Sequence, residues 1–86
     1  MIKYRLFFHK NTLSDKAKLK AAKLLDKTHQ LCRILETDPR PPISKQLHGD
    51  LLGKRSIRIN LQHRLVYEIF EEEKIVHILS MWRHYE

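Results

Sequence analysis

The strongest constraint on the fold of this chain is an alternation of apolar and polar side chains between positions 55 and 69. Ile57, Ile59 and Leu61 share one parity and Arg58 has the other, which is typical of a strand with one buried face. After a break at residues 60–63 the alternation resumes, with Leu65, Tyr67 and Ile69 on one side. Two such runs separated by a short break predict a β-hairpin.

The register of this hairpin follows from its apolar faces, because a slip of one residue would exchange the two faces. Matching the faces places Ile57 opposite Leu65. The same register sets Arg58 directly across from Arg64, with both side chains pointing away from the core. Like charges placed opposite each other destabilise a sheet unless an anion lies between them. The arginine pair therefore indicates a site for an anion.

The residues before the hairpin predict a strand followed by two helices. Residues 2–9 alternate, and residues 12–36 have helical periodicity with a break near residues 21–25. The apolar stripe that we expect these helices to bury is Leu13, Ala17, Ala21, Leu24, Thr28, Leu31 and Leu35.

The prolines at 39, 41 and 42 end the helical region. A loop then continues to Gly53, with Gly49 and Gly53 permitting backbone turns that other residues resist. A polar turn at residues 71–74, expected to be solvated, leads to a last strand at residues 75–82. The expected fold is α+β: an N-terminal strand, two helices and a three-stranded antiparallel meander, with the helices on one face of the sheet. The opposite face, which carries the arginines, would stay open.

Charge and cysteine content limit the kinds of binding partner and the cellular compartment to be expected. The 86 residues contain 17 Lys and Arg against 10 Asp and Glu, a formal charge of +7, which favours an acidic or polyanionic partner. The lysines of the helical region form either a solvated face or a footprint for nucleic acid. The lone Cys32 excludes an internal disulfide and suits a reducing compartment, and no apolar run is long enough to span a bilayer. We therefore expect a cytoplasmic protein.

The chemistry that remains after elimination is positive charge combined with proton transfer. Six histidines are present, but no pair has i, i+4 spacing, and there is no Cys/His cluster, glycine-rich nucleotide loop or nucleophile elbow. We expect no metal and no cofactor. Arginine can hold phosphate oxygens, and histidine can transfer protons near neutral pH. Arg58 and Arg64 with His84 and Tyr85 at the chain end would suit metal-free cleavage of RNA.

Four segments carry a resemblance to a known family: Leu47-His-Gly-Asp-Leu-Leu-Gly53, Arg58-Ile59, His63-Arg-Leu-Val-Tyr67 and His84-Tyr85. In order and length the whole chain resembles the Txe/YoeB toxins of the RelE/ParE superfamily. The resemblance implies a single toxin domain over residues 1–86. It also implies a ribosome-dependent mRNA endonuclease of a type II toxin–antitoxin system, which cuts the codon in the ribosomal A site. The implied partners are the ribosome, mRNA and an acidic antitoxin of the YefM/Phd kind, and a homodimer is left open.

The resemblance also assigns roles at matching positions. Arg64 corresponds to the arginine that stabilises the phosphate, Arg58 to a second arginine, His84 to the general acid and Tyr85 to a tyrosine that positions substrate. Lys45 stands where the family has a glutamate as general base. The cations expected to contact RNA or the ribosome are Lys18, Lys20, Lys23, Lys54 and Arg55.

The replacement of the glutamate leaves three hypotheses open. The first is an endoribonuclease attenuated by Lys45, because a lysine accepts a proton only in its neutral form. The second is a toxin that occupies the ribosome and stalls translation without cleavage. The third is a gyrase-poisoning toxin of the ParE kind on the same fold.

Overall fold

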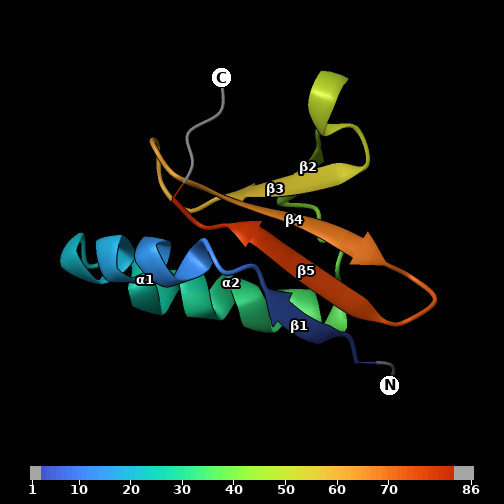
Figure 1. Cartoon of the computed structure of the whole chain (residues 1–86), viewed down its shortest axis with the longest axis horizontal. Helices are drawn as coiled ribbons and strands as arrows, with labels where there is room; N and C mark the ends of the chain where they lie inside the picture. The colour runs from blue at the N-terminus through green and yellow to red at the C-terminus, as the bar shows by residue number, and fades with distance from the viewer. Residues whose placement is uncertain (1–2, 83–86) are drawn as a thin grey trace.

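The computed structural model describes residues 3–82, which form two helices and a five-stranded mixed sheet (Figure 1). The sheet order is β1-β5-β4-β3-β2. The strands are β1 (Arg5–Phe8), β2 (Ser44–Gln46), β3 (Lys54–Arg58), β4 (Arg64–Phe70) and β5 (Ile75–Ser80), and the helices are α1 (Thr12–Ala21), α2 (Leu25–Thr37) and the short 3₁₀ turn η1 (Gly49–Leu51). The predicted α+β class is confirmed.

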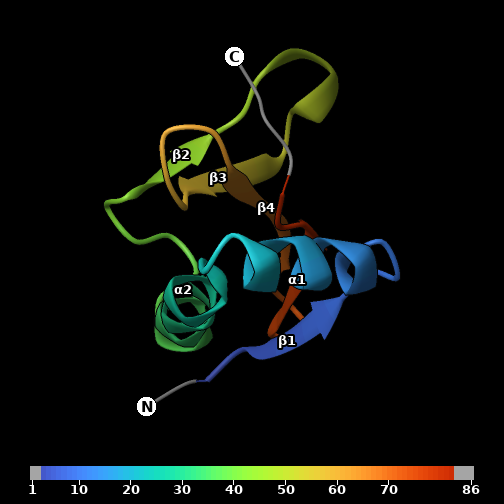
Figure 2. The same cartoon turned by 90° about the vertical axis from the view of Figure 1, so that its left-hand side faces the viewer.

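Both helices cover the same face of the sheet (Figure 2). The core lies between these layers, where α1 and α2 pack onto β3, β4 and β5. Its buried members are Leu19, Leu31, Cys32, Leu35, Ile57, Ile59, Leu65, Tyr67, Val76, Ile78 and Met81. Among residues 3–82, no helix is long and apolar enough to cross a bilayer.

The β3–β4 hairpin has the register that the sequence predicts. Ile57 pairs with Leu65 and Arg58 pairs with Arg64. Leu61 is an exception: it lies in the turn beyond the strands and is 86% exposed, so its assignment to the buried face is wrong. The turn ends the alternation because its side chains no longer face the helices.

Two features of the sheet were not predicted. β1 joins the sheet by parallel pairing with β5, Leu6 lying opposite Val76, with the two helices in the connection. β2 lies within the segment predicted as loop and pairs antiparallel with β3, placing Lys45 opposite Ser56. A strand of three residues is too short to show a period of two.

The predicted break between the helices is confirmed, with Lys23 at a positive φ of 61°. The stripe on α2 is also confirmed at Thr28, Leu31 and Leu35. The stripe on α1 is wrong, because Leu13 is 76% exposed. The buried residues of α1 are Thr12, Asp15 and Leu19, two of which are polar, so a search for apolar periodicity misses this face.

Asp15 explains why a polar side chain of α1 is buried. Its Oδ2 accepts a hydrogen bond of 3.0 Å from the backbone N–H of Met81, directly after β5. A buried N–H without an acceptor would be costly. This contact ties α1 to the end of the last strand.

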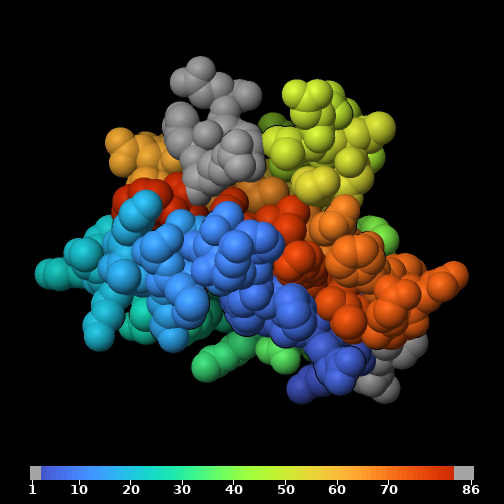
Figure 3. Space-filling view, viewed as in Figure 1, coloured from blue at the N-terminus to red at the C-terminus, as the bar shows by residue number. Residues whose placement is uncertain are grey.

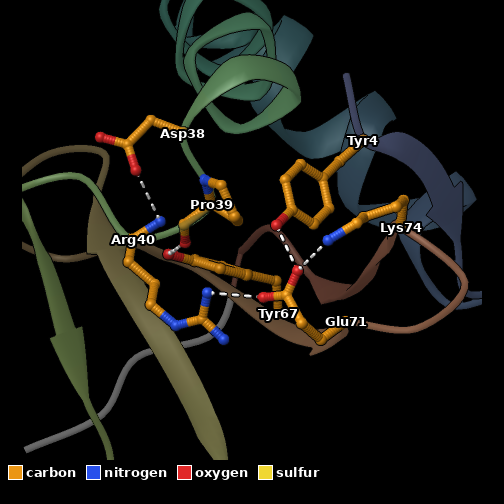
Figure 4. A network of polar contacts seen from close by, with 7 residues as sticks. All are labelled: Tyr4, Asp38, Pro39, Arg40, Tyr67, Glu71 and Lys74. Atoms are coloured by element: carbon orange, nitrogen blue, oxygen red, sulfur yellow. Dashed lines mark hydrogen bonds and ion pairs between the residues drawn. The ribbon is translucent and has the colours of Figure 1, made fainter. Parts of the chain in front are cut away.

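A bulge changes which side chains β4 buries. The register with β5 shifts between Val66 and Tyr67, and both side chains are buried although they have opposite parity. The Tyr67 hydroxyl donates a hydrogen bond of 2.7 Å to the carbonyl oxygen of Pro39. That bond fixes the proline-rich segment between α2 and β2 (Figure 4).

The turn at residues 71–74 is not simply solvated. Glu71 accepts hydrogen bonds from Arg40 at 2.9 Å and Lys74 at 2.7 Å, and a third from the Tyr4 hydroxyl (Figure 4). These donors, Lys74 first, lower the pKa of Glu71 to about 2. We call Tyr4, Arg40, Glu71 and Lys74 the Glu71 cluster. It joins the start of the chain, the segment after α2 and the β4–β5 turn.

Candidate functional site

The pocket with the clearest chemical character lies between α2, the α2–β2 connection and the β2–β3–β4 part of the sheet. Its volume is about 630 Å³. Its positively charged lining residues are Lys27, Lys45, Arg58 and Arg64, and Ser56 also lines it. We call it the cationic pocket.

Strand pairing explains why three of these cations share one face of the sheet. Lys45 pairs with Ser56, and two residues further along β3 Arg58 pairs with Arg64. Directly paired residues project to the same face, about 4.5–5.5 Å apart at Cβ, and residues i and i+2 share a face. The sheet therefore collects Lys45, Ser56, Arg58 and Arg64 on one face, while Ile57 and Leu65 enter the core.

The charges of the cationic pocket are not neutralised by the part of the chain that the structure describes. No Asp or Glu is among the described residues that line it. The salt bridges formed by residues 3–82 involve Arg40, Lys54 and Lys74, and none of the four pocket cations. Positive charges held close together repel one another, and a bound anion relieves that repulsion. The pocket is therefore suited to an anion.

The described end of the chain lies against the β3–β4 turn. His63 Nδ1 is 2.8 Å from the carbonyl oxygen of Trp82, and the two rings stack at 3.6 Å with an interplanar angle of 19°. Because a carbonyl oxygen only accepts, Nδ1 of His63 carries the proton in this bond. His84 and Tyr85 lie outside the described residues. The contact places Trp82, the last described residue, beside His63, the residue before Arg64.

The other predicted RNA-contacting cations lie outside the cationic pocket. Arg55 has the parity of Ile57, and its Nε and Nη2 donate to the Ser44 Oγ at 3.1 and 2.8 Å. Lys54 is 3.8 Å from a carboxylate oxygen of Glu68. The three lysines on α1 and the turn after it are exposed and do not line the pocket: Lys18, Lys20 and Lys23.

Among the pocket residues that were not predicted as site residues, two carry chemistry suited to an anion, Ser56 and Lys27. Ser56 has the parity of Arg58, a signal in the hairpin pattern that could have identified it. Lys27 looked like any other lysine of the helical region, because only the packing of α2 near the sheet brings it to the pocket.

Cysteine and metal chemistry receive no support from the described residues. Cys32 is buried, and burial raises the pKa of its thiol to about 11, which leaves it protonated and unreactive near neutral pH. Within residues 3–82, no group of three or more His, Cys, Asp or Glu side chains is placed to hold a metal ion.

Comparison with known families and structures identifies the class of protein. A sequence profile of the ParE toxin of the type II toxin–antitoxin system parDE matches residues 3–86. The chain therefore belongs to the ParE toxin family of type II toxin–antitoxin systems. No curated protein sequence matches it.

Solved structures place the chain more narrowly. It is 27% identical to a chain of the RelBE2 toxin–antitoxin complex from Mycobacterium tuberculosis, with a TM-score of 0.79 and coverage of 98% of this chain and 100% of that one. The YoeB dimer from Staphylococcus aureus is 25% identical, with a TM-score of 0.80 and coverage of 96% and 99%. A YoeB/ParE toxin from Agrobacterium tumefaciens has the same fold, with 24% identity, a TM-score of 0.84 and coverage of 94% and 99%. Within the RelE/ParE superfamily, this chain is similar to YoeB and RelE toxins.

Proposed function

We propose that this toxin is an endoribonuclease that cleaves mRNA in the ribosomal A site without a metal ion. The observation that carries the proposal is the convergence of Lys45, Arg58 and Arg64 in one pocket whose described lining includes no carboxylate. A phosphodiester entering this pocket would meet fixed positive charge before reaction. Such preorganised charge is often the largest single contribution to catalysis.

In this proposal the 2′-oxygen of the RNA attacks the adjacent phosphorus, and the bond to the 5′-oxygen breaks. Arg64 and Arg58 bind the non-bridging oxygens, on which charge accumulates. His84 gives a proton to the departing 5′-oxygen, and Tyr85 stacks on a base. Lys45, in its neutral form, accepts the proton of the 2′-hydroxyl. The products are a 2′,3′-cyclic phosphate and a new 5′-hydroxyl end.

The contact between His63 and Trp82 supports the part of the proposal that concerns the chain end. Trp82, the last described residue, is held beside the residue that precedes Arg64, and His84 is two positions further along the sequence.

For the partners, we propose the ribosome with its mRNA and an acidic antitoxin. Solved relatives include a YoeB–YefM complex from Staphylococcus aureus and the RelBE toxin–antitoxin complex from Escherichia coli. A chain of charge +7 with an unneutralised cationic pocket is suited to an acidic segment that folds on contact. Both partners are cytoplasmic, which is where we expect this toxin to act.

The decisive experiment is primer extension on a message translated in a purified system. The wild-type chain is expected to create new mRNA 5′ ends at A-site codons, and His84→Ala is expected to reduce them about a hundredfold. His29→Ala is the matched control, because His29 is an exposed histidine of α2 and should not affect cleavage. Undiminished cleavage by His84→Ala would refute the catalytic role.

A second candidate is a toxin that blocks the A site without cutting RNA. It is favoured by Lys45, which occupies the pocket position where the resemblance calls for a carboxylate base. Translation arrest with intact message would select this candidate. Inhibited DNA supercoiling with unaffected translation would instead select gyrase poisoning.

A further inference from the structure

The side chain of Ser56 has an unmet hydrogen-bonding capacity at the floor of the cationic pocket. It is 1% exposed, and its Oγ has no hydrogen-bond partner among residues 3–82. Ser56 pairs with Lys45 on one side and Val66 on the other, and it lies two residues from Arg58 on the same face. The hydroxyl therefore belongs to the surface that carries the arginines.

An unpaired buried hydroxyl destabilises the folded state, because it loses its bonds to water and gains none in return. Such groups in native proteins call for an explanation, and a bound ligand is one of them. The nearest polar neighbours on this face, Lys45 and Arg58, are exposed. Their long side chains can change rotamer and open a path from the pocket to the hydroxyl.

Lys27 brings charge to the same pocket from the other layer of the fold. It lies on α2, is exposed and forms no salt bridge with the part of the chain that the structure describes. The pocket is therefore cationic on its helical side as well as on its sheet side, so that two consecutive phosphates of one strand could be bound.

We propose that Ser56 and Lys27 complete a phosphate-binding site for single-stranded RNA. Ser56 Oγ donates a hydrogen bond to a non-bridging oxygen of the phosphate held by Arg58 and Arg64, and Lys27 forms an ionic contact with the neighbouring phosphate. This inference rests on the proposed function in taking RNA as the ligand. It adds two contacts that neither the sequence patterns nor the resemblance assigned.

The geometry favours a phosphate over the carboxylate of an acidic peptide. Two arginines present planar forks of N–H donors, and the Ser56 hydroxyl adds a single donor from β3, two residues before Arg58. A phosphodiester is tetrahedral and offers acceptors in several directions, whereas a carboxylate offers two oxygens in one plane. Ile43 and Pro42 add apolar lining that suits a ribose or a base edge.

The test is binding of a short 2′-O-methylated single-stranded RNA, which cannot be cleaved at its 2′ position, measured by fluorescence anisotropy. Ser56→Ala is expected to weaken binding about tenfold, the effect of losing one hydrogen bond to a charged group. Ser56→Thr keeps the hydroxyl and should bind within about twofold of wild type. Ser80→Ala is the matched control, because the Ser80 Oγ is also buried and without a hydrogen-bond partner in the described part of the chain, but Ser80 does not line the cationic pocket.

Thermal unfolding separates this role from a structural one. Removing an unpaired hydroxyl should leave the Tm of Ser56→Ala unchanged or slightly raised while RNA binding falls. Wild-type binding by Ser56→Ala would overturn the proposal. So would a loss of binding accompanied by a clear fall in Tm, because the hydroxyl would then be a folding contact.

A pair of lysine variants tests the helical side of the pocket at constant net charge. Lys27→Ala should weaken RNA binding about threefold to tenfold and reduce the slope of log K against log salt by about 0.7, the value for one lost contact to a single strand. Lys16→Ala removes the same charge from α1 outside the pocket and should change the slope little. Equal effects of the two variants would overturn the contact.

The binding assay does not depend on cleavage, so the two proposals can fail separately. If Arg64→Ala weakens RNA binding but Ser56→Ala and Lys27→Ala do not, this inference fails and the proposed function stands. If the Ser56 and Lys27 variants lose RNA binding as expected but the wild-type chain cuts no message, the inference stands and the proposed function fails. Loss of binding to an acidic peptide by Ser56→Ala, with RNA binding intact, would assign the pocket to a protein partner and overturn the inference.

Discussion

Two regions of this toxin contain arginine and lysine at the surface of the sheet, and they differ in how the charge is balanced. In the Glu71 cluster, Arg40 and Lys74 both bind the carboxylate of Glu71. In the cationic pocket, Lys27, Lys45, Arg58 and Arg64 form no salt bridge with any residue in the range 3–82. The space-filling view shows the β4–β5 turn, which contributes to the cluster, packed beside β1 (Figure 3).

The difference separates charges that join segments from charges left available to a ligand. The Glu71 cluster connects the start of the chain, the segment after α2 and the β4–β5 turn. Its cations therefore act within the fold. The pocket cations repel one another in the free protein and gain interaction energy only when an anion binds. Net charge alone does not reveal this distinction, because cations of both kinds contribute to the +7.

The largest expected effect is a difference in cleavage rate between variants of Arg64 and Arg40. Arg64→Ala should reduce ribosome-dependent cleavage about 10²–10³-fold, as is typical when one preorganised donor to a developing oxyanion is removed. Arg40→Ala removes the same charge from the Glu71 cluster and should leave cleavage nearly unchanged. Quantitative primer extension measures both. Similar losses in the two variants would mean that overall charge, rather than the pocket, drives the reaction.

The next effect concerns the proton acceptor. Lys45→Glu places a carboxylate in the cationic pocket and should raise the cleavage rate about a hundredfold, within the usual range of general base catalysis. Lys45→Gln, which removes the charge without supplying a base, is the control. A Lys45→Glu variant that cleaves no faster than Lys45→Gln would show that the missing carboxylate does not limit the enzyme.

A smaller effect is expected for a carboxylate that acts only within the fold. Asp15→Ala leaves the buried N–H of Met81 without an acceptor and should lower the free energy of unfolding by about 2 kcal/mol. Asp15→Asn retains an oxygen acceptor and should lose less. Urea denaturation followed by circular dichroism gives both values. Equal stability of Asp15→Ala and wild type would show that water replaces the acceptor.

The smallest effect is the pH dependence of the Glu71 cluster. The pKa of Glu71 in the folded protein, about 2, lies below its ordinary value of 4.5. The stabilisation is therefore complete above the ordinary value and is lost as the pH falls towards the folded-state value. Glu71→Gln should lower the Tm slightly at neutral pH, and this difference should vanish near pH 2. Thermal scans across that range check the sign, and a difference that grows on acidification would contradict it.

The buried face of α2 follows from its sequence and that of α1 does not, for a physical reason. On α2 the buried positions Thr28, Leu31 and Leu35 follow the helical period, so the pattern identified its face. On α1 the buried Thr12 and Asp15 are polar and are stabilised by hydrogen bonds to distant or preceding backbone. Apolar periodicity detects burial driven by the hydrophobic effect and misses burial that depends on a partner.

The residues of the cationic pocket also differ in whether the sequence alone could identify them. Arg58 and Arg64 could be paired from the sequence because alternation and a short turn fix the register of a hairpin. Ser56 has the right parity but acquires significance only through its burial and unpaired hydroxyl. Lys27 and Lys20 cannot be distinguished in sequence, because only the position of α2 beside the α2–β2 connection brings Lys27 to the pocket.

By itself, the sequence determined the local elements: the hairpin and its register, the break between the helices, the buried face of α2 and the excess of positive charge. The tertiary structure alone decided the parallel pairing of β1 with β5, the short β2 strand, the bulge at Val66 and the separation of paired from unpaired cations. The reason is that periodicity within one element records which of its sides is buried. Which distant elements meet there depends on the free energy of packing the whole chain.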